Sequence, residues 1–111
     1  MKEKCFVDTT VILKVILEKR IDVLEELSRY TLHTSVNVLE ESAFKIVVSS
    51  VLEALKVEKV NIYKIKEKFE KGVGIDLISK RLHVLNYLKS RLIVIPLNDK
   101  IFEFSKEIIK K

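Results

Sequence analysis

Glycine, proline, cysteine and tryptophan are all scarce in this sequence. Its 111 residues include 2 glycines, 1 proline, 1 cysteine and no tryptophan, and glutamine is absent. Turns and flexible linkers are usually rich in glycine and proline. Because both are scarce here, we expect helices and strands joined by short connections. The single cysteine, Cys5, excludes an intrachain disulfide, and its apolar neighbours favour a buried thiol.

Long hydrophobic runs and targeting signals are also missing. No apolar run approaches the roughly 20 residues that a membrane-spanning helix requires, and the N-terminus lacks a signal-peptide pattern. We therefore predict no membrane association and a cytoplasmic location. A chain of 111 residues has room for one hydrophobic core, so residues 1–111 are expected to form a single domain.

The composition is that of an ordered, basic domain. Hydrophobic residues make up 48% of the chain and charged residues 33%, which excludes a disordered class. Lysine outnumbers arginine by 17 to 4, a usage typical of thermophiles. The net charge of +5 is compatible with a phosphate-rich partner such as RNA, but the 16 interspersed acids fit a solvated lysine-rich surface equally well.

Apolar patterns predict alternating strands and helices, which favours an α/β fold. Continuous apolar runs indicate buried strands at 4–7 and 92–95, with a shorter strand at 31–34. The clearest helical pattern follows Ser35 and consists of Phe44, Val47, Val48, Val51, Leu52 and Leu55. Further helices are expected at 11–19, 21–30, 61–71, 76–91 and from Asp99 onward, with a break at residues 72–74.

Asp8 stands where the first strand leads into a helix. The carboxyl ends of parallel strands are where α/β proteins place ligands. Asp8, followed by Thr9 and Thr10, is therefore a candidate carboxylate ligand for Mg²⁺ or Mn²⁺, which prefer oxygen donors. The alternative is a helix N-cap, since Asp and Thr both cap well. The spacing alone leaves both interpretations open.

Two adjacent acids, Glu40 and Glu41, lie in the helix that follows Ser35. They flank its apolar stripe on opposite sides, so periodicity does not choose between them. Ser35 is a natural N-cap, and Asp99 has the same role at the start of the last predicted helix. His33 and His83 have no partner at metal-ligand spacing, and no zinc pattern, catalytic triad or phosphate-binding glycine loop is present.

The order and spacing of Cys5-Phe6-Val7-Asp8-Thr9-Thr10 and Thr34-Ser35-Val36-Asn37-Val38-Leu39-Glu40-Glu41 resemble the PIN domain family. This family comprises metal-dependent ribonucleases and includes toxins of toxin–antitoxin pairs. The resemblance implies a three-layer α/β fold, with a short parallel sheet of about three strands and about six helices. It implies RNA as substrate, Mg²⁺ or Mn²⁺ as cofactor, a homodimer and an antitoxin protein as partners.

The resemblance also assigns residues. Asp8 and Glu41, which is six residues after Ser35, would be the catalytic and metal-binding carboxylates. Thr9, Thr10, Ser35 and Asp99 would support them. The later acids of the family, including that of a D-A-L-x-x-A segment, have no counterpart before Lys111, so we expect weak or no nuclease activity.

Three hypotheses follow from these patterns. The chain is a metal-dependent endoribonuclease of reduced activity, a catalytically inactive PIN remnant that serves as an interaction module, or an unrelated α/β binding domain whose acids are caps. The joint occurrence of the two motifs argues against the third. Without the family's last segment, the strand at 4–7 or 92–95 should have an unpaired edge. We expect a homodimer that buries a C-terminal helix carrying Ile101, Phe102, Ile108 and Ile109.

Overall fold

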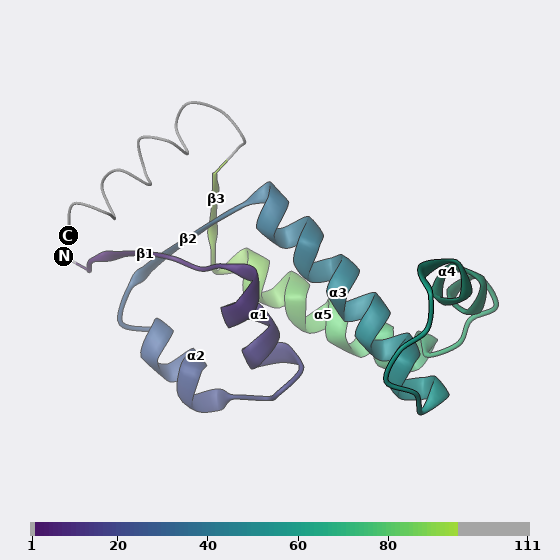
Figure 1. Ribbon diagram of the computed structural model, residues 1–111. Coiled ribbons are helices and arrows are strands. Elements are labelled where there is room, and N and C mark those ends of the chain that lie inside the picture. Colours follow the sequence, from purple (N-terminus) through teal and green to yellow (C-terminus); the bar gives the residue numbers. More distant parts are fainter. Residues whose placement is uncertain (1, 96–111) are drawn as a thin grey trace.

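The computed structural model describes residues 2–95 and gives the α/β architecture that the sequence predicts (Figure 1). Five helices and a three-stranded parallel sheet lie within this range, while the helix predicted from Asp99 lies outside it. The strands are β1 (Lys4–Phe6), β2 (Thr31–Ser35) and β3 (Ile93–Ile95). The helices are α1 (Thr9–Ile16), α2 (Ile21–Leu27), α3 (Val36–Leu55), α4 (Ile62–Glu70) and α5 (Ile75–Ser90).

The sheet has the order β1-β2-β3, so β2 is its central strand. Phe6 lies opposite His33, which in turn lies opposite Ile93, and Ser35 lies opposite Ile95. Because all three strands are parallel, their carboxyl ends meet at one edge of the sheet. The chain therefore leaves β1 toward Asp8, and β2 toward α3, at that same edge.

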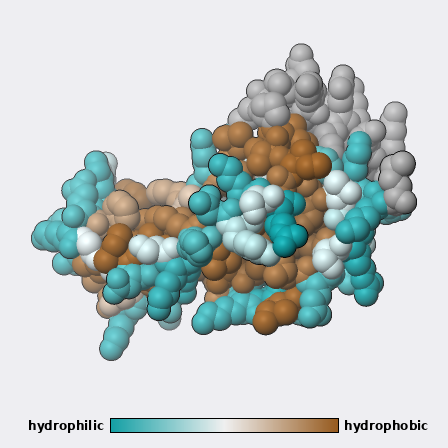
Figure 2. Space-filling model, turned by 180° about the vertical axis from the view of Figure 1, so that it is seen from behind, coloured by the Kyte–Doolittle hydropathy of each residue, from teal (hydrophilic) through white to brown (hydrophobic). Residues whose placement is uncertain are grey.

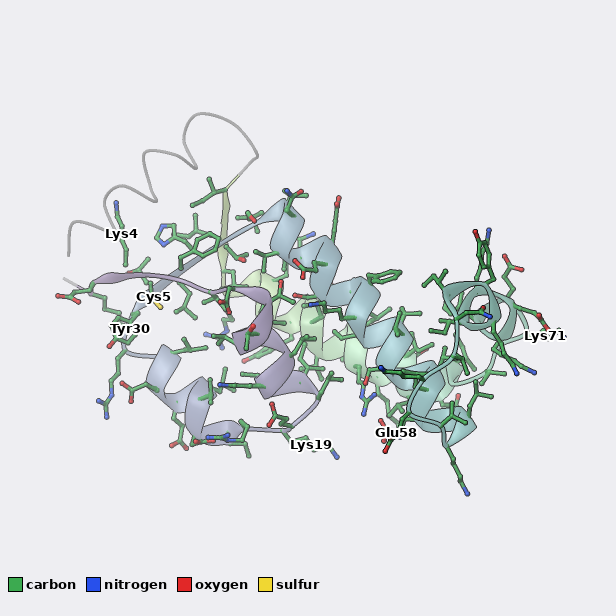
Figure 3. The ribbon with its side chains drawn as sticks, viewed as in Figure 1. Lys4, Cys5, Lys19, Tyr30, Glu58 and Lys71 are labelled. Atoms are coloured by element: carbon green, nitrogen blue, oxygen red, sulfur yellow. The ribbon has the colours of Figure 1, made fainter. Side chains whose placement is uncertain are left out.

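The described helices lie on one side of the sheet (Figure 1). Cys5 pairs in register with Leu32, and Leu32 packs against the main core cluster, which includes Val7 and Ile12. Lys4 points to the other side of β1 from Cys5 (Figure 3). The helix expected from Asp99 onward lies outside the described residues.

The strands predicted to be buried at 4–7 and 92–95 are buried only in part. Within residues 2–95, β1 and β3 are both edge strands. Lys4 is exposed, Cys5 and Phe6 are half-buried, and Ile93 is 51% exposed, whereas Val7 and Ile95 are buried. An edge strand has a neighbour on only one side, so its side chains are covered less completely than those of a central strand. Among the described strands, β1 and β3 each pair with β2 alone.

Helix α3 is the centre of the helical layer, since it packs against α1, α4 and α5. Ile46 and Val51 are fully buried. The buried serines Ser42 and Ser50 donate hydrogen bonds of 2.7 and 2.6 Å to backbone carbonyls one turn earlier in α3. A helix that other helices contact on several sides buries positions outside its apolar stripe as well. The serines of α3 lie in the core for this reason.

The apolar stripe predicted on α3 is buried only in part. Phe44 is 56% exposed. The other five residues belong to a second core cluster that α3 shares with α4 and α5. Arg81 of α5 strengthens this contact, because its guanidinium donates to Ser50 Oγ at 3.0 Å and to a carboxylate oxygen of Glu53 at 2.7 Å.

The predicted break at residues 72–74 is confirmed as the connection between α4 and α5. Gly72 and Gly74 have φ angles of +84° and +76°, which residues with a side chain rarely adopt. A Cβ on Gly74 would lie 3.1 Å from the carbonyl oxygen of Ser50. Gly74 therefore permits both the turn and the close approach of α5 to α3. No helix between residues 2 and 95 is long and apolar enough to cross a membrane.

Candidate functional site

Asp8 is the N-cap of α1. Its Oδ1 accepts a hydrogen bond of 3.0 Å from the backbone N–H of Val11, and its side chain is exposed. The capping interpretation is thus confirmed. A carboxylate has about four lone-pair positions, so a cap that uses one of them leaves capacity for a second ligand. Capping and metal binding are compatible at this residue.

Glu41 lies in the second turn of α3, with its carboxylate in solvent. Its Oε1 is 3.0 Å from Nζ of Lys45, one turn later on the same helix. The Thr9 hydroxyl lies near enough to this carboxylate to make a smaller contribution to its pKa. The hydrogen bond and charge of Lys45, followed by the smaller contribution of Thr9, lower the pKa of Glu41 from its ordinary value.

The packing of α1 against α3 brings the beginnings of the two helices together, with Thr9 near Glu41. Thr9 is the first residue of α1 and follows Asp8 directly. Glu41 therefore lies near the residue that follows Asp8, at the carboxyl edge of the sheet. Two acids that are separated by 32 intervening residues in the sequence thus belong to neighbouring elements at this edge.

The supporting residues have separate positions. Ser35 is buried and caps α3, because its Oγ accepts a hydrogen bond of 3.2 Å from the N–H of Val38. Thr9 is buried and lies near Glu41, whereas Thr10 is exposed on α1. Asp99 lies outside the described residues.

Two residues at this edge were missed by the sequence analysis. Lys45 pairs with Glu41 at the i, i+4 spacing that stabilises opposite charges on helices, so the spacing itself was an available signal. Thr34 is fully buried, and its Oγ1 donates a hydrogen bond of 2.8 Å to the carbonyl of Val7. No local sequence pattern predicts this hydrogen bond, because its two residues are 27 positions apart in the chain.

The remaining polar candidates do not join this edge. His33 is buried in β2 with Nδ1 3.2 Å from the carbonyl oxygen of Thr31, and His83 is exposed on α5. Burial, and secondarily the negative charge of Asp8, raise the pKa of the Cys5 thiol, which makes it a poor nucleophile. No group of three or more His, Cys, Asp or Glu residues able to hold a metal ion occurs between residues 2 and 95.

Asp8 and Glu41 nevertheless fit one type of metal site. Mg²⁺ commonly keeps several waters and is held by only one or two carboxylates together with substrate phosphates. Both carboxylates are exposed, so water and a phosphate have access to them. Lys45 already balances the charge of Glu41, which makes it a competitor for a cation at this position.

No protein-family model matches this chain, and no curated protein or solved structure is similar enough to count as a match. The assignment of a function therefore rests on the residues and on their placement in the fold.

Proposed function

We propose that this chain is a PIN-type, metal-dependent endoribonuclease of weak activity, with Asp8 and Glu41 as its metal-binding and catalytic carboxylates. The observation that carries the proposal is that α1 packs against α3 at the carboxyl edge of the sheet, which brings Thr9, the residue after Asp8, near Glu41. A protein that used Asp8 and Ser35 only as helix caps would have no need to bring the acid of α3 to the start of α1. The cofactor would be Mg²⁺ or Mn²⁺, and the substrate RNA.

Each residue then has a specific part. Asp8 and Glu41 would hold the cation, whose chemistry when bound is to polarise the scissile phosphate and activate a water. Thr9 would help to orient the Glu41 carboxylate, and Ser35 fixes the start of the helix that carries it. Lys45 offers a positive charge beside the acids, which would attract the RNA backbone. The net charge of +5 acts in the same direction.

Weak activity is expected because only two carboxylates support the site in the described residues. Positioning an attacking water within reach of the phosphate normally requires more fixed ligands. The test is cleavage of a fluorescent single-stranded RNA in millimolar Mn²⁺ by the full chain and by the variants Asp8→Asn and Glu41→Gln. Glu40→Gln is the matched control, since Glu40 is the neighbouring exposed acid.

Slow, Mn²⁺-dependent cleavage that both site variants abolish, and that Glu40→Gln retains, would support the proposal. Cleavage unchanged by both site variants would identify a contaminating nuclease. If the full chain cleaves no RNA, a measurement of Mn²⁺ binding decides whether the metal site exists. Binding that Asp8→Asn and Glu41→Gln remove would support an inactive member of the same architecture, and no binding would reject the metal site.

The second candidate is a catalytically inactive PIN-like module that binds protein partners, including a second copy of itself or an antitoxin. An exposed apolar groove between α3 and α4 favours it. The groove has a volume of about 380 Å³ and includes Phe44, Ile62 and Phe69, which are 56%, 51% and 41% exposed. Apolar side chains are visible between hydrophilic ones on the rear of the molecule, toward the end that carries α4 (Figure 2). Exposed apolar surface of this kind is typical of interfaces.

Light scattering at micromolar concentration tests the homodimer. Phe44→Asp should convert a dimer formed through this groove into monomer, whereas Tyr63→Asp should not. Tyr63 is 82% exposed on the same helix pair but does not line the groove. The interface expected from the sequence involves Phe102 and Ile109, outside the described residues, and substituting both with Asp tests it separately. A monomeric parent chain would reject the homodimer.

A further inference from the structure

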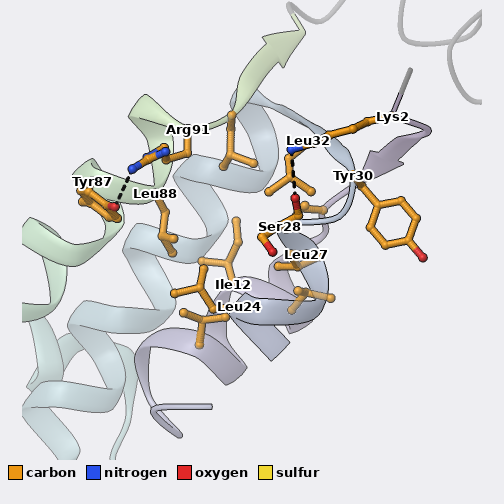
Figure 4. A pocket seen from close by; sticks show the side chains of 14 residues that line it. Lys2, Ile12, Leu24, Leu27, Ser28, Tyr30, Leu32, Tyr87, Leu88 and Arg91 are labelled. Atoms are coloured by element: carbon orange, nitrogen blue, oxygen red, sulfur yellow. Dashed lines mark hydrogen bonds between the residues drawn. The ribbon is translucent and has the colours of Figure 1, made fainter. Parts of the chain in front are cut away.

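A second cavity, which neither Asp8 nor Glu41 lines, lies between the sheet and helices α1, α2 and α5 (Figure 4). Its volume is about 410 Å³, which is within the usual range for small-molecule sites. Aliphatic side chains form most of its wall, among them Val11, Ile12, Val15, Leu24, Leu27 and Leu88. Such a wall favours an aliphatic ligand, because burying apolar surface is the only strong interaction that it offers.

Two cationic side chains, Lys2 and Arg91, also line this cavity. They lie on opposite sides of the group of leucines and isoleucine in Figure 4. Arg91 donates to the Tyr87 hydroxyl at 3.0 Å and lies 5.4 Å from the centre of that ring. Lys2 donates to the backbone carbonyl of Ser28 at 3.1 Å. No carboxylate of residues 2–95 forms an ion pair with either cation.

The partners of Arg91 leave its charge available. A tyrosine hydroxyl and a tyrosine ring hold the guanidinium in place without neutralising it. A guanidinium is a planar fork of donors that matches a carboxylate with two parallel hydrogen bonds. An arginine held at the mouth of an aliphatic cavity is therefore suited to a ligand with one anionic end and an apolar chain.

We propose that this cavity binds an aliphatic carboxylate of the fatty-acid class, with the chain among the leucines and the carboxylate at Arg91. Lys2 adds a second positive charge at the opposite side of the cavity. The proposal does not depend on the nuclease proposal, because neither Asp8 nor Glu41 lines the cavity.

Calorimetric titration of the full chain with dodecanoate, below its micelle concentration, tests the proposal. Two matched ligands with the same chain serve as comparisons: the cationic dodecyltrimethylammonium and the net-uncharged dodecyldimethylamine oxide. We expect one dodecanoate per chain and weaker binding of both comparison ligands. Arg91→Gln should weaken dodecanoate binding at least about tenfold, the loss expected for a charge-assisted hydrogen bond. Arg29→Gln should have no effect, since Arg29 is exposed on the surface, near Glu26.

A second variant tests the apolar part. Val15→Phe places a larger side chain in the cavity and should abolish binding, with folding checked by circular dichroism. If that variant fails to fold, the comparison of Arg91→Gln with Arg29→Gln decides. Equal binding of the three ligands, equal effects of the two arginine variants, or no binding of dodecanoate to the folded parent chain would each overturn the proposal.

Discussion

The hydroxyl of Thr34, in the central strand, donates a hydrogen bond of 2.8 Å to the backbone carbonyl of Val7. Thr34 is fully buried, and Val7 is the residue that precedes Asp8. The backbone N–H of Val7 donates in turn to the carbonyl of His33 at 2.7 Å. Both polar groups of Val7 are thus bound to β2, which holds the chain in position just before Asp8.

Thr34→Val should destabilise the protein. The substitution keeps the shape of the side chain but removes the donor to the buried Val7 carbonyl, so we expect a loss of about 1–3 kcal/mol in the free energy of unfolding. Urea denaturation measures this loss. Thr10→Val is the control, because Thr10 is exposed on the following helix, and it should change stability by less than about 0.5 kcal/mol. Equal effects of the two variants would contradict the role assigned to the Thr34 hydroxyl.

Asp8 caps α1 and also carries a negative charge, and two substitutions separate the effects of these two roles. Asn caps helices as well as Asp does, so Asp8→Asn should preserve stability while removing the carboxylate. Asp8→Ala removes the bond to the Val11 N–H as well and should cost about 1 kcal/mol of unfolding free energy. Mn²⁺ binding should be lost in both variants. Retained binding in Asp8→Asn would show that the carboxylate has no role in a metal site.

Lys45→Gln should raise the pKa of Glu41, because the ammonium group of Lys45 is the main cause of its lowering. In the parent chain the folded-state pKa of Glu41 lies below the ordinary value of 4.5. The pair therefore stabilises the fold above that pH, and this contribution is lost as the pH falls through the folded-state value. NMR titration of the Glu41 side chain checks the pKa, and acid unfolding of the variant should depend less on pH below 4.5.

The same variant should bind Mn²⁺ more tightly at neutral pH, since Glu41 remains ionised there and its competing cation is gone. Lys71→Gln is the control. Lys71 lies 3.1 Å from Glu67 at the same i, i+4 spacing and lowers the pKa of that carboxyl. Its removal should raise the pKa of Glu67 and leave Mn²⁺ binding unchanged. Tighter binding in both variants would indicate a general charge effect rather than a site at Glu41.

Gly74→Ala and Gly72→Ala form a matched pair. Both glycines have positive φ angles, so each substitution should cost about 1 kcal/mol or more of unfolding free energy through backbone strain. Gly74→Ala should cost more, because its Cβ would also meet the Ser50 carbonyl oxygen at 3.1 Å, whereas a Cβ on Gly72 meets nothing within 4 Å. Thermal unfolding of both variants ranks them, and a larger loss for Gly72→Ala would contradict this packing.

Several features of the site could be predicted because they depend on neighbours in the chain. Asp8 and Ser35 cap helices through N–H groups three residues later, and such contacts form wherever the helix forms. The same is true of the Gly72 and Gly74 break. The order of strands and helices followed from apolar periodicity, which reports local burial.

Tertiary structure alone decided the rest. The proximity of Thr9 distinguishes Glu41 from Glu40, and it follows from the packing of α1 against α3. Phe44 belongs to an apolar stripe in the sequence, yet it is exposed because α4 leaves an open groove beside it. The strand at 4–7 has the apolar run of a buried strand but lies at an edge of the described sheet, since strand order is set by long-range pairing. Periodicity specifies which elements form, and packing between distant elements determines which of their side chains meet.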